Sequence, residues 1–285
     1  MKISLINPIG YCKGVVNAIN TLYDVKKTYP NKTIYLMGQL VHNDYTNQKL
    51  LEDNVKIITS DKEEFINSIN EGIVVFSAHG ISKKILNKAK EKGLITIDTT
   101  CPYVKKSMDL VKGYINNGYE VIYISTKKHP ETEAMCSISK DIHVVESIKD
   151  IDNLTLESKK VFVTNKTTLS IYDIREMFDY ILLKYPYAII SDEVCNSSRL
   201  RQQQIMNIDS DVDTIIVVGD KHSNNATNLF KLACESKKQA FMVSNINEFD
   251  ISVLSSASHV ALVSAASTPI ELVKEIEKEI KNRFF

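Results

Sequence analysis

Three of the five cysteines occupy comparable places in the chain and together could hold a metal centre. Cys12, Cys101 and Cys195 each follow a short hydrophobic run, at residues 3–6, 94–97 and 188–190, and each precedes an amphipathic stretch. We therefore predict that each cysteine lies where a strand ends and a helix begins. The N-terminus of a helix lowers the pKa of a thiol and stabilises a bound thiolate.

Three thiolates without a fourth favour an iron-sulfur cube over a structural zinc ion. Structural zinc normally takes four ligands, often including two cysteines two to four residues apart, and the chain has no such pair. Iron-sulfur clusters prefer soft thiolates, and three of them leave one iron open as a Lewis acid for a substrate oxygen. Because cysteine is also a common core residue, three buried core thiols remain the alternative.

Polar residues at the ends of six other hydrophobic runs repeat the spacing of the cysteines. Nine strand ends thus form three sets, and each set contains one thiol and two hydrogen-bonding groups. The period of roughly 90 residues suits small α/β lobes better than a solenoid. We predict lobes at residues 1–101 (Cys12, His42, His79), 102–194 (His129, Glu131, Thr167) and 195–285 (Cys195, Ser223, Ser267).

Strands and helices are predicted to alternate along the whole chain, which indicates an α/β protein with parallel sheets. Strand–helix–strand units imply right-handed crossovers, and ligands of such sheets bind beyond the carboxyl ends of the strands. If the three lobes face one centre, their polar strand ends meet there. Further strands are predicted at 33–36, 73–76, 121–124, 161–163, 215–218 and 260–263, and helices at 15–27, 83–92, 104–116, 171–184, 200–208, 226–236 and 270–282.

Composition excludes several classes of protein. Lys+Arg and Asp+Glu both number 35, so no net charge attracts nucleic acid or an anionic membrane. No apolar run approaches the ~20 residues of a membrane span, and the N-terminal strand before Pro8 does not resemble a secretory leader. An odd number of scattered cysteines argues against a disulfide framework and for a reducing compartment. We expect a cytoplasmic protein, and we expect it to be a monomer.

Eight motifs resemble, in their order and spacing, the 4-hydroxy-3-methylbut-2-enyl diphosphate reductase (LytB) family. They span Asn7 to about Pro269 and read GYCKGVVNAI, LVHND, FSAHG, DTTCPYV, KHPETE, TNKTTLS, CNSSRLRQ and SAASTP. The resemblance implies a trefoil of three α/β lobes around one central [4Fe–4S] cluster, held by Cys12, Cys101 and Cys195 with one open iron. It also implies reductive removal of an allylic hydroxyl, the last step of the methylerythritol phosphate route, to give isopentenyl and dimethylallyl diphosphates.

The resemblance assigns roles in this reaction to three residues of the second lobe. Glu131 matches the family's proton donor, which would protonate the departing hydroxyl. Thr167 would orient the hydroxyl or a water, and His129 would support proton delivery. Without the resemblance, Glu131 after Pro130 would be interpreted as a carboxylate that stabilises a helix N-terminus, and Thr167 as a helix cap.

The diphosphate is expected to be held by hydrogen bonds without a strongly basic pocket. Helix N-termini can add backbone donors. Asn224 stands where the family commonly has a second serine, and its amide can still donate a hydrogen bond. The resemblance implies substrate contacts from His42, His79, His129, Thr167, Ser223, Asn224, Asn225 and Ser267.

Other residues also depart from the family's usual pattern. Lys166 stands where glutamine is frequent, and it either adds a cationic contact to the diphosphate or points to solvent. Ala265 replaces a usual glycine, which puts a close approach of the backbone in doubt. His222 and Thr46 replace a frequent asparagine and a common valine. The remaining cysteines, Cys136 and Cys234, are expected to be core thiols.

Two other functions share some of these features. A cluster-dependent dehydratase or synthase such as quinolinate synthase also resembles a three-lobed, three-cysteine design. The KHPE and TTLS strand ends, and the lack of a clear set of carboxylate-binding arginines, favour the reductase. A non-catalytic iron-sulfur sensor would need neither Glu131 nor Thr167, and the chain has no basic DNA-binding stretch. Because no flavin, nicotinamide or ATP motif is present, we expect electrons from a separate protein such as ferredoxin or flavodoxin.

Overall fold

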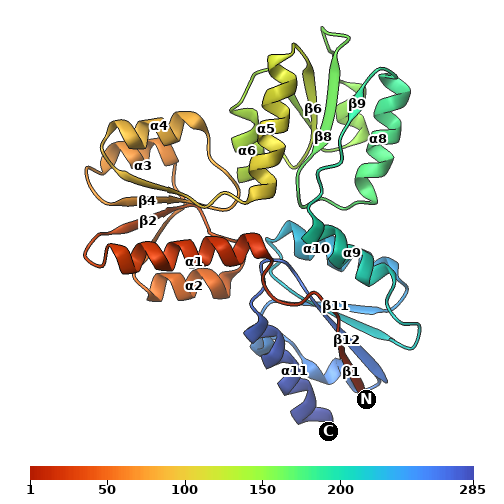
Figure 1. The fold of residues 1–285 in the computed structure, drawn as a ribbon. Helices are drawn as coiled ribbons and strands as arrows, with labels where there is room; N and C mark the ends of the chain where they lie inside the picture. Colours follow the sequence, from red (N-terminus) through yellow and green to blue (C-terminus); the bar gives the residue numbers. More distant parts are fainter. The chain divides into compact units, whose positions relative to one another are not determined.

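The computed structural model describes all 285 residues and contains three parallel four-stranded sheets flanked by helices (Figure 1). The chain divides into two compact units. Unit 1 comprises Met1–Val16, Val41–Lys49 and Asn196–Phe285, and unit 2 comprises Asn17–Leu40 and Leu50–Cys195. No helix combines the length and apolar character that a membrane span requires. The predicted α/β class with three parallel-sheet lobes is confirmed.

The three sheets share one strand order, and all their strand pairs are parallel. In each sheet, the strand that precedes a cysteine lies at one edge. The first sheet has the order β3 (Lys56–Ile58), β2 (Ile34–Met37), β4 (Ile73–Phe76), β5 (Ile95–Asp98). The second has β7 (Ile142–Val145), β6 (Glu120–Ile124), β8 (Val161–Asn165), β9 (Ile189–Ile190), and the third has β11 (Gln239–Val243), β10 (Thr214–Val218), β12 (His259–Ser264), β1 (Lys2–Leu5).

The N-terminal strand belongs to the third sheet, which corrects the predicted lobe 1–101. β1 pairs with β12, with Lys2 opposite His259. The corresponding edge of the first sheet is taken by β5, which pairs with β4, so β1 completes the open edge beside β12. By sheet, Cys101 therefore groups with His42 and His79, Cys195 with His129 and Thr167, and Cys12 with Ser223 and Ser267. The division at residues 101 and 194 stays a prediction.

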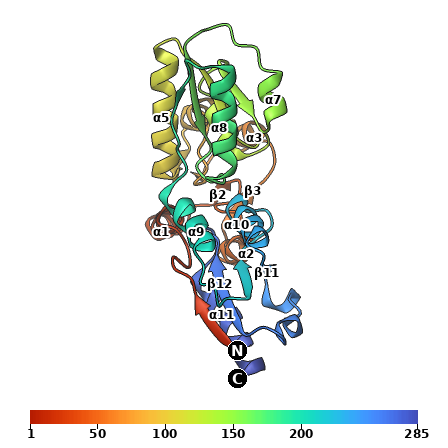
Figure 2. The same cartoon turned by 90° about the vertical axis from the view of Figure 1, so that its right-hand side faces the viewer.

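Each sheet is covered by helices on both faces because its strands are apolar on both sides. On the first sheet, α1 (Lys13–Thr28) and α2 (Asp44–Glu52) pack on one face, and α3 (Lys62–Ser68) and α4 (Lys83–Glu91) on the other (Figure 1). The second sheet lies between α5 (Pro102–Asn116) with α6 (Pro130–Cys136) and α7 (Ile148–Asp152) with α8 (Asp173–Lys184). Figure 2 shows α5 and α7 on opposite sides of this part of the chain. The third lies between α11 (Ile270–Phe284) and the pair α9 (Asn196–Met206) and α10 (Asn224–Glu235).

Candidate active site

The three cysteines are tied to their sheets by the same backbone hydrogen bond. The N–H of Cys101 donates to the carbonyl of Ala78 at 3.0 Å, and the N–H of Cys195 donates to that of Thr167 at 2.9 Å. The N–H of Cys12 donates to the carbonyl of Ala266 at 3.0 Å. Each acceptor lies two residues beyond the end of a central strand, β4, β8 or β12. This bond places each cysteine next to a polar strand end of its own sheet.

Each of these cysteines also lies at the beginning of a helix, as predicted. Cys101 is the N-cap of α5, with Pro102 in the first turn, and Cys195 and Cys12 directly precede α9 and α1. All three are half-buried, and no cysteine of the chain forms a disulfide. Because helix N-termini stabilise thiolates, and thiolates are the ligands that iron-sulfur clusters prefer, this set of donors fits such a cluster.

Glu131 and Thr167 meet in a buried polar cluster of unit 2. The carboxylate Oε1 of Glu131 accepts the backbone N–H of Thr167 at 2.9 Å, and Oε2 accepts the Thr167 hydroxyl at 3.1 Å. The hydroxyl of Tyr123 donates to Oε1 at 3.4 Å. Glu131 is 2% exposed and Thr167 is 3% exposed. The structure thus joins the predicted acid to the threonine predicted to orient the substrate hydroxyl.

The surroundings of Glu131 favour its protonated form more than water does. Burial raises the pKa of Glu131 above its ordinary value, although hydrogen bonds from Thr167 and the charge of Lys166 oppose this effect. Burial and the neighbouring Glu131 carboxylate raise the pKa of Tyr123 well above its ordinary range, so Tyr123 stays neutral. A raised pKa favours the protonated carboxyl, which is the form that a general acid requires.

His129 is held at the start of the helix that carries Glu131. It is the N-cap of α6, and its Nδ1 accepts the backbone N–H of Glu131 at 3.1 Å. A ring that accepts a hydrogen bond at Nδ1 is neutral and carries its proton on Nε2. The ring contacts that of His79 edge-on, with ring centroids 5.3 Å apart. Two of the predicted diphosphate ligands therefore lie side by side in unit 2.

The predicted serine and asparagine ligands meet in unit 1 at the N-terminus of α10. Ser223 is the N-cap, and its Oγ accepts the N–H of Ala226 at 3.4 Å and the hydroxyl of Ser267 at 3.2 Å. Asn225 accepts the N–H of Ala266 at 2.8 Å. The side-chain nitrogen of Asn224 is buried without a hydrogen-bond partner. His42 lies in the loop between β2 and α2, also in unit 1, and is half-buried.

The structure shows the surroundings of two residues that depart from the family pattern. Lys166 is 0% exposed, so the alternative that it points to solvent is wrong. Ala265 is buried, and its neighbour across the sheet is Gly219, where an added Cβ would come within 3.0 Å of the Ala265 Cβ. An added Cβ at Gly219 would also come within 2.7 Å of the Ala226 Cβ, so the backbone is closely approached at position 219. The prediction of a core thiol is wrong for Cys234, which is exposed, whereas Cys136 is half-buried against the core of the second sheet.

Sequence reasoning missed two buried residues that shape the site. Tyr123 was assigned only to a buried strand, and the one signal was a hydroxyl within an otherwise aliphatic run. Arg201 of α9 is buried and donates to the carbonyl of Gly10 at 2.7 Å and to that of Ser264 at 3.0 Å. It thereby fixes the loop that leads to Cys12. No local pattern in SSRLRQ indicates this role.

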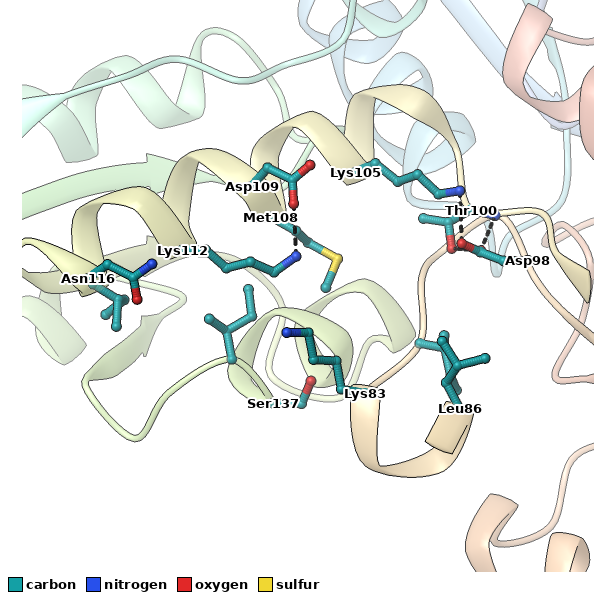
Figure 3. Close-up of a pocket in the computed structure, with 13 residues that line it drawn as sticks. Lys83, Leu86, Asp98, Thr100, Lys105, Met108, Asp109, Lys112, Asn116 and Ser137 are labelled. Atoms are coloured by element: carbon teal, nitrogen blue, oxygen red, sulfur yellow. Dashed lines mark hydrogen bonds and ion pairs between the residues drawn. The ribbon is translucent and has the colours of Figure 1, made fainter. Parts of the chain in front are cut away.

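A pocket of about 510 Å³ in unit 2 contains none of the predicted site residues. It lies along α5, between α4 and the end of α6 (Figure 3). Lys105 pairs with Asp98 at 2.8 Å, and Lys112 pairs with Asp109 at 2.8 Å. Because these charges are compensated within the pocket wall, it does not present the concentrated positive charge that a diphosphate would favour.

Comparison with known proteins gives one consistent family. The model of the LytB protein family matches residues 3–281. A 4-hydroxy-3-methylbut-2-enyl diphosphate reductase of Geobacillus sp. (strain WCH70) is 39% identical over 283 residues, covering 97% of this chain and 89% of the relative. One of Malacoplasma penetrans (strain HF-2) is 39% identical over 288 residues, covering 97% and 96%. The solved E-1-hydroxy-2-methyl-but-2-enyl-4-diphosphate reductase from Plasmodium falciparum matches with a TM-score of 0.93 and 32% identity, covering 100% of this chain and 89% of that chain.

Proposed function

The chain belongs to the LytB family of 4-hydroxy-3-methylbut-2-enyl diphosphate reductases, and on that premise we propose that Cys12, Cys101 and Cys195 are the protein ligands of one iron-sulfur cluster. The family's reaction is the terminal step of the methylerythritol phosphate route, a reductive dehydroxylation that gives isopentenyl and dimethylallyl diphosphates. The observation that carries the ligand assignment is the common position of the three cysteines. Each follows an edge strand, precedes a helix and donates its N–H to a carbonyl two residues beyond the end of the neighbouring central strand.

The donor set indicates the type of cluster. Three thiolates and no fourth cysteine in an equivalent position favour a [4Fe–4S] cluster with one iron that lacks a protein thiolate. Such a cluster, when bound, supplies electrons and a Lewis-acidic site. Cys136 and Cys234 lie within α6 and α10 rather than at strand ends, so we exclude them from the ligand set.

Glu131 is the proposed proton donor, and Thr167 is the proposed relay to the leaving hydroxyl. Oε1 of Glu131 accepts two hydrogen bonds, whereas Oε2 accepts one, from the Thr167 hydroxyl. The proton of the neutral carboxyl is therefore best placed on Oε2, from which it can be donated to Thr167 Oγ1. The Thr167 hydroxyl then donates its own proton to the departing hydroxyl, which leaves as water.

The diphosphate is proposed to be bound by neutral donors at strand ends and helix N-termini. In unit 1 these are the hydroxyls of Ser223 and Ser267, the buried amide of Asn224, and the first turn of α10. Asn225 holds the loop of Ser267 in place through Ala266, and it also contacts substrate in this proposal. His42, His79 and His129 add ring N–H donors. Helix N-termini bind phosphate oxygens through backbone N–H groups and the helix dipole.

Electrons are proposed to come from a separate carrier such as ferredoxin or flavodoxin. This inference is supported by the lack of a nicotinamide, flavin or ATP motif in the sequence. We also propose that the protein is cytoplasmic, because none of its cysteines forms a disulfide, and that it acts as a monomer.

The function is tested by turnover of the protein with its cluster assembled under anaerobic conditions. With a reduced viologen as electron source, it should consume the allylic alcohol diphosphate and form both isoprenoid diphosphates. The Cys101→Ser variant, prepared in the same way, should form neither. Failure of the parent to form product despite full iron and sulfide content would refute the proposed function.

A further inference from the structure

A lysine with no exposed surface, Lys166, directly precedes Thr167, whose backbone N–H and hydroxyl bind the carboxylate of the proposed acid Glu131 at 2.9 and 3.1 Å. Lys166 follows β8, and its backbone N–H donates to the carbonyl of Ile124 at 2.9 Å. Its side chain is 0% exposed, and its Nζ donates to the Thr126 hydroxyl at 3.4 Å. It forms no direct ion pair, although an ammonium group has three N–H donors. The structure thus buries a cation that direct contacts compensate only weakly.

Glu131 is the buried acidic group whose carboxylate form interacts with this lysine. Burial lowers the pKa of Lys166 to about 8, while the charges of Glu131 and Glu146 oppose the decrease. Glu146 is exposed, and Glu131 is buried. Charges interact more strongly where water is excluded, so Glu131 is the partner through which Lys166 can affect the site. The dependence is mutual, since the ammonium also opposes the rise in the pKa of Glu131.

We propose that Lys166 is a positioning residue whose buried ammonium limits how firmly Glu131 holds its proton, and thereby sets the upper pH limit of turnover. The proposal rests on the acid role of Glu131. It gives Lys166 no contact with the substrate. A carboxyl in an apolar pocket without a nearby cation would hold its proton too firmly to donate it readily, whereas Lys166 stabilises the carboxylate that remains after donation.

The other groups around Glu131 do not supply this charge. Tyr123 faces the carboxyl from β6 and is kept neutral by burial. His129 precedes Glu131 on α6 and accepts its N–H at Nδ1, which a doubly protonated ring cannot do. Thr167 carries no charge. Glu146, which follows β7, is an acidic residue and cannot supply a cation. Lys166 is therefore the cation that acts on Glu131.

The direction of the effect follows from the charges. A nearby cation favours the carboxylate, so removing it should raise the pKa of Glu131. Because the protonated acid is the active form, turnover falls as pH rises through that pKa. In Lys166→Met, which keeps the apolar stem but loses the charge, this decline should move to higher pH by roughly 1 unit, the lower end of the effect of a close opposite charge. Lys166→Arg should restore the decline to its original position.

The test reads the protonation of Glu131 directly and does not depend on turnover. The infrared band of the protonated carboxyl, assigned by its loss in Glu131→Gln, is titrated in the parent and in Lys166→Met. The control is Lys160→Met, because Lys160 is exposed and precedes the same strand at its opposite end. We expect the midpoint to rise by roughly 1 pH unit in Lys166→Met and to stay unchanged in the control. If Lys166→Met does not fold, the shorter Lys166→Gln takes its place.

The outcomes separate this inference from the proposed function. If the midpoint of the Glu131 titration is the same in Lys166→Met as in the parent, the proposed role of Lys166 is overturned. If this variant also binds substrate more weakly, Lys166 contacts the diphosphate instead. A shifted midpoint with an unshifted pH profile of turnover refutes Glu131 as the donor, and the positioning role fails with it. A shift of both, reversed by Lys166→Arg, supports the proposal.

Discussion

Replacing Glu131 with glutamine should remove the proposed proton donor while keeping its contacts. Glutamine can still accept the Thr167 N–H and the Tyr123 hydroxyl at the Oε1 position, where the distances are 2.9 and 3.4 Å. Its amide nitrogen, in place of Oε2, can donate to the Thr167 oxygen at 3.1 Å. All three hydrogen bonds thus persist, with one reversed in direction.

The structure gives different magnitudes for the effects on stability and on catalysis. Exchanging the neutral carboxyl for a neutral amide keeps the number of hydrogen bonds and changes the free energy of unfolding by about 1 kcal/mol. Loss of a general acid lowers the rate by roughly 10²- to 10⁴-fold, or about 3–5 kcal/mol in the activation barrier. Catalysis should therefore fail in a protein that remains folded and binds substrate.

The assay compares turnover under reducing, anaerobic conditions with substrate binding and denaturant unfolding of the same samples. The matched control is Glu133→Gln, the same chemical change in the same helix, because Glu133 is exposed and pairs only with Lys62. It should turn over like the parent. Turnover by Glu131→Gln within a few-fold of the parent would contradict the reasoning and transfer the acid role to His129 or a bound water.

Three further predictions follow from other parts of the structure. Serine at any of the three strand-end cysteines should lower bound iron and sulfide, whereas Cys136→Ser should not, and full occupancy in any of the three would contradict the assignment to Cys12, Cys101 and Cys195. Phenylalanine at His42 or at His79 should weaken binding of the diphosphate and leave the cluster content unchanged. If both variants bind the diphosphate as tightly as the parent does, the diphosphate is bound elsewhere. Because the pKa of Lys166 is about 8 in the folded chain and ~10.4 in an unfolded one, the unfolded state binds more protons between these values, and the free energy of unfolding should rise with pH across this range. This rise should be absent from Lys166→Met. If the free energy of unfolding depends on pH in the same way in the parent and in Lys166→Met, the assignment of the rise to Lys166 is wrong.

The sequence predicted the central strands well because their signal is local. Residues 73–76 are all buried in the structure, and a continuous apolar run is typical of a parallel strand covered on both faces. It missed β3, β7 and β11, the outer edge strands, because their apolar runs are short: β3 and β11 begin with the polar residues Lys56 and Gln239, and β7 contains His143. The strand at the N-terminus was predicted, but its partner was not. Its pairing with residues near position 260 depends on which sheet edge is open, and local sequence does not encode this.

Positions in the candidate site were predictable where a short loop joins a strand to a helix. The placement of Cys12, Cys101 and Cys195 between a strand and a helix follows from such transitions, and so does the placement of Ser223 beyond the end of a strand. The direction of a side chain beyond a strand end was not predictable, because long-range packing fixes it. The burial of Lys166 therefore emerged only from the structure.

The central claim, an open cluster that meets the substrate, is tested most directly by one spectroscopic comparison. The electron paramagnetic resonance spectrum of the reduced, anaerobically reconstituted protein is recorded with and without the allylic alcohol diphosphate. We predict a signal typical of one [4Fe–4S] cluster, and a change in that signal on addition of the substrate. The change should persist in Glu131→Gln, which binds but does not turn over, and should be weaker in His42→Phe at the same substrate concentration. A fully loaded cluster whose signal stays the same at saturating substrate would contradict the account.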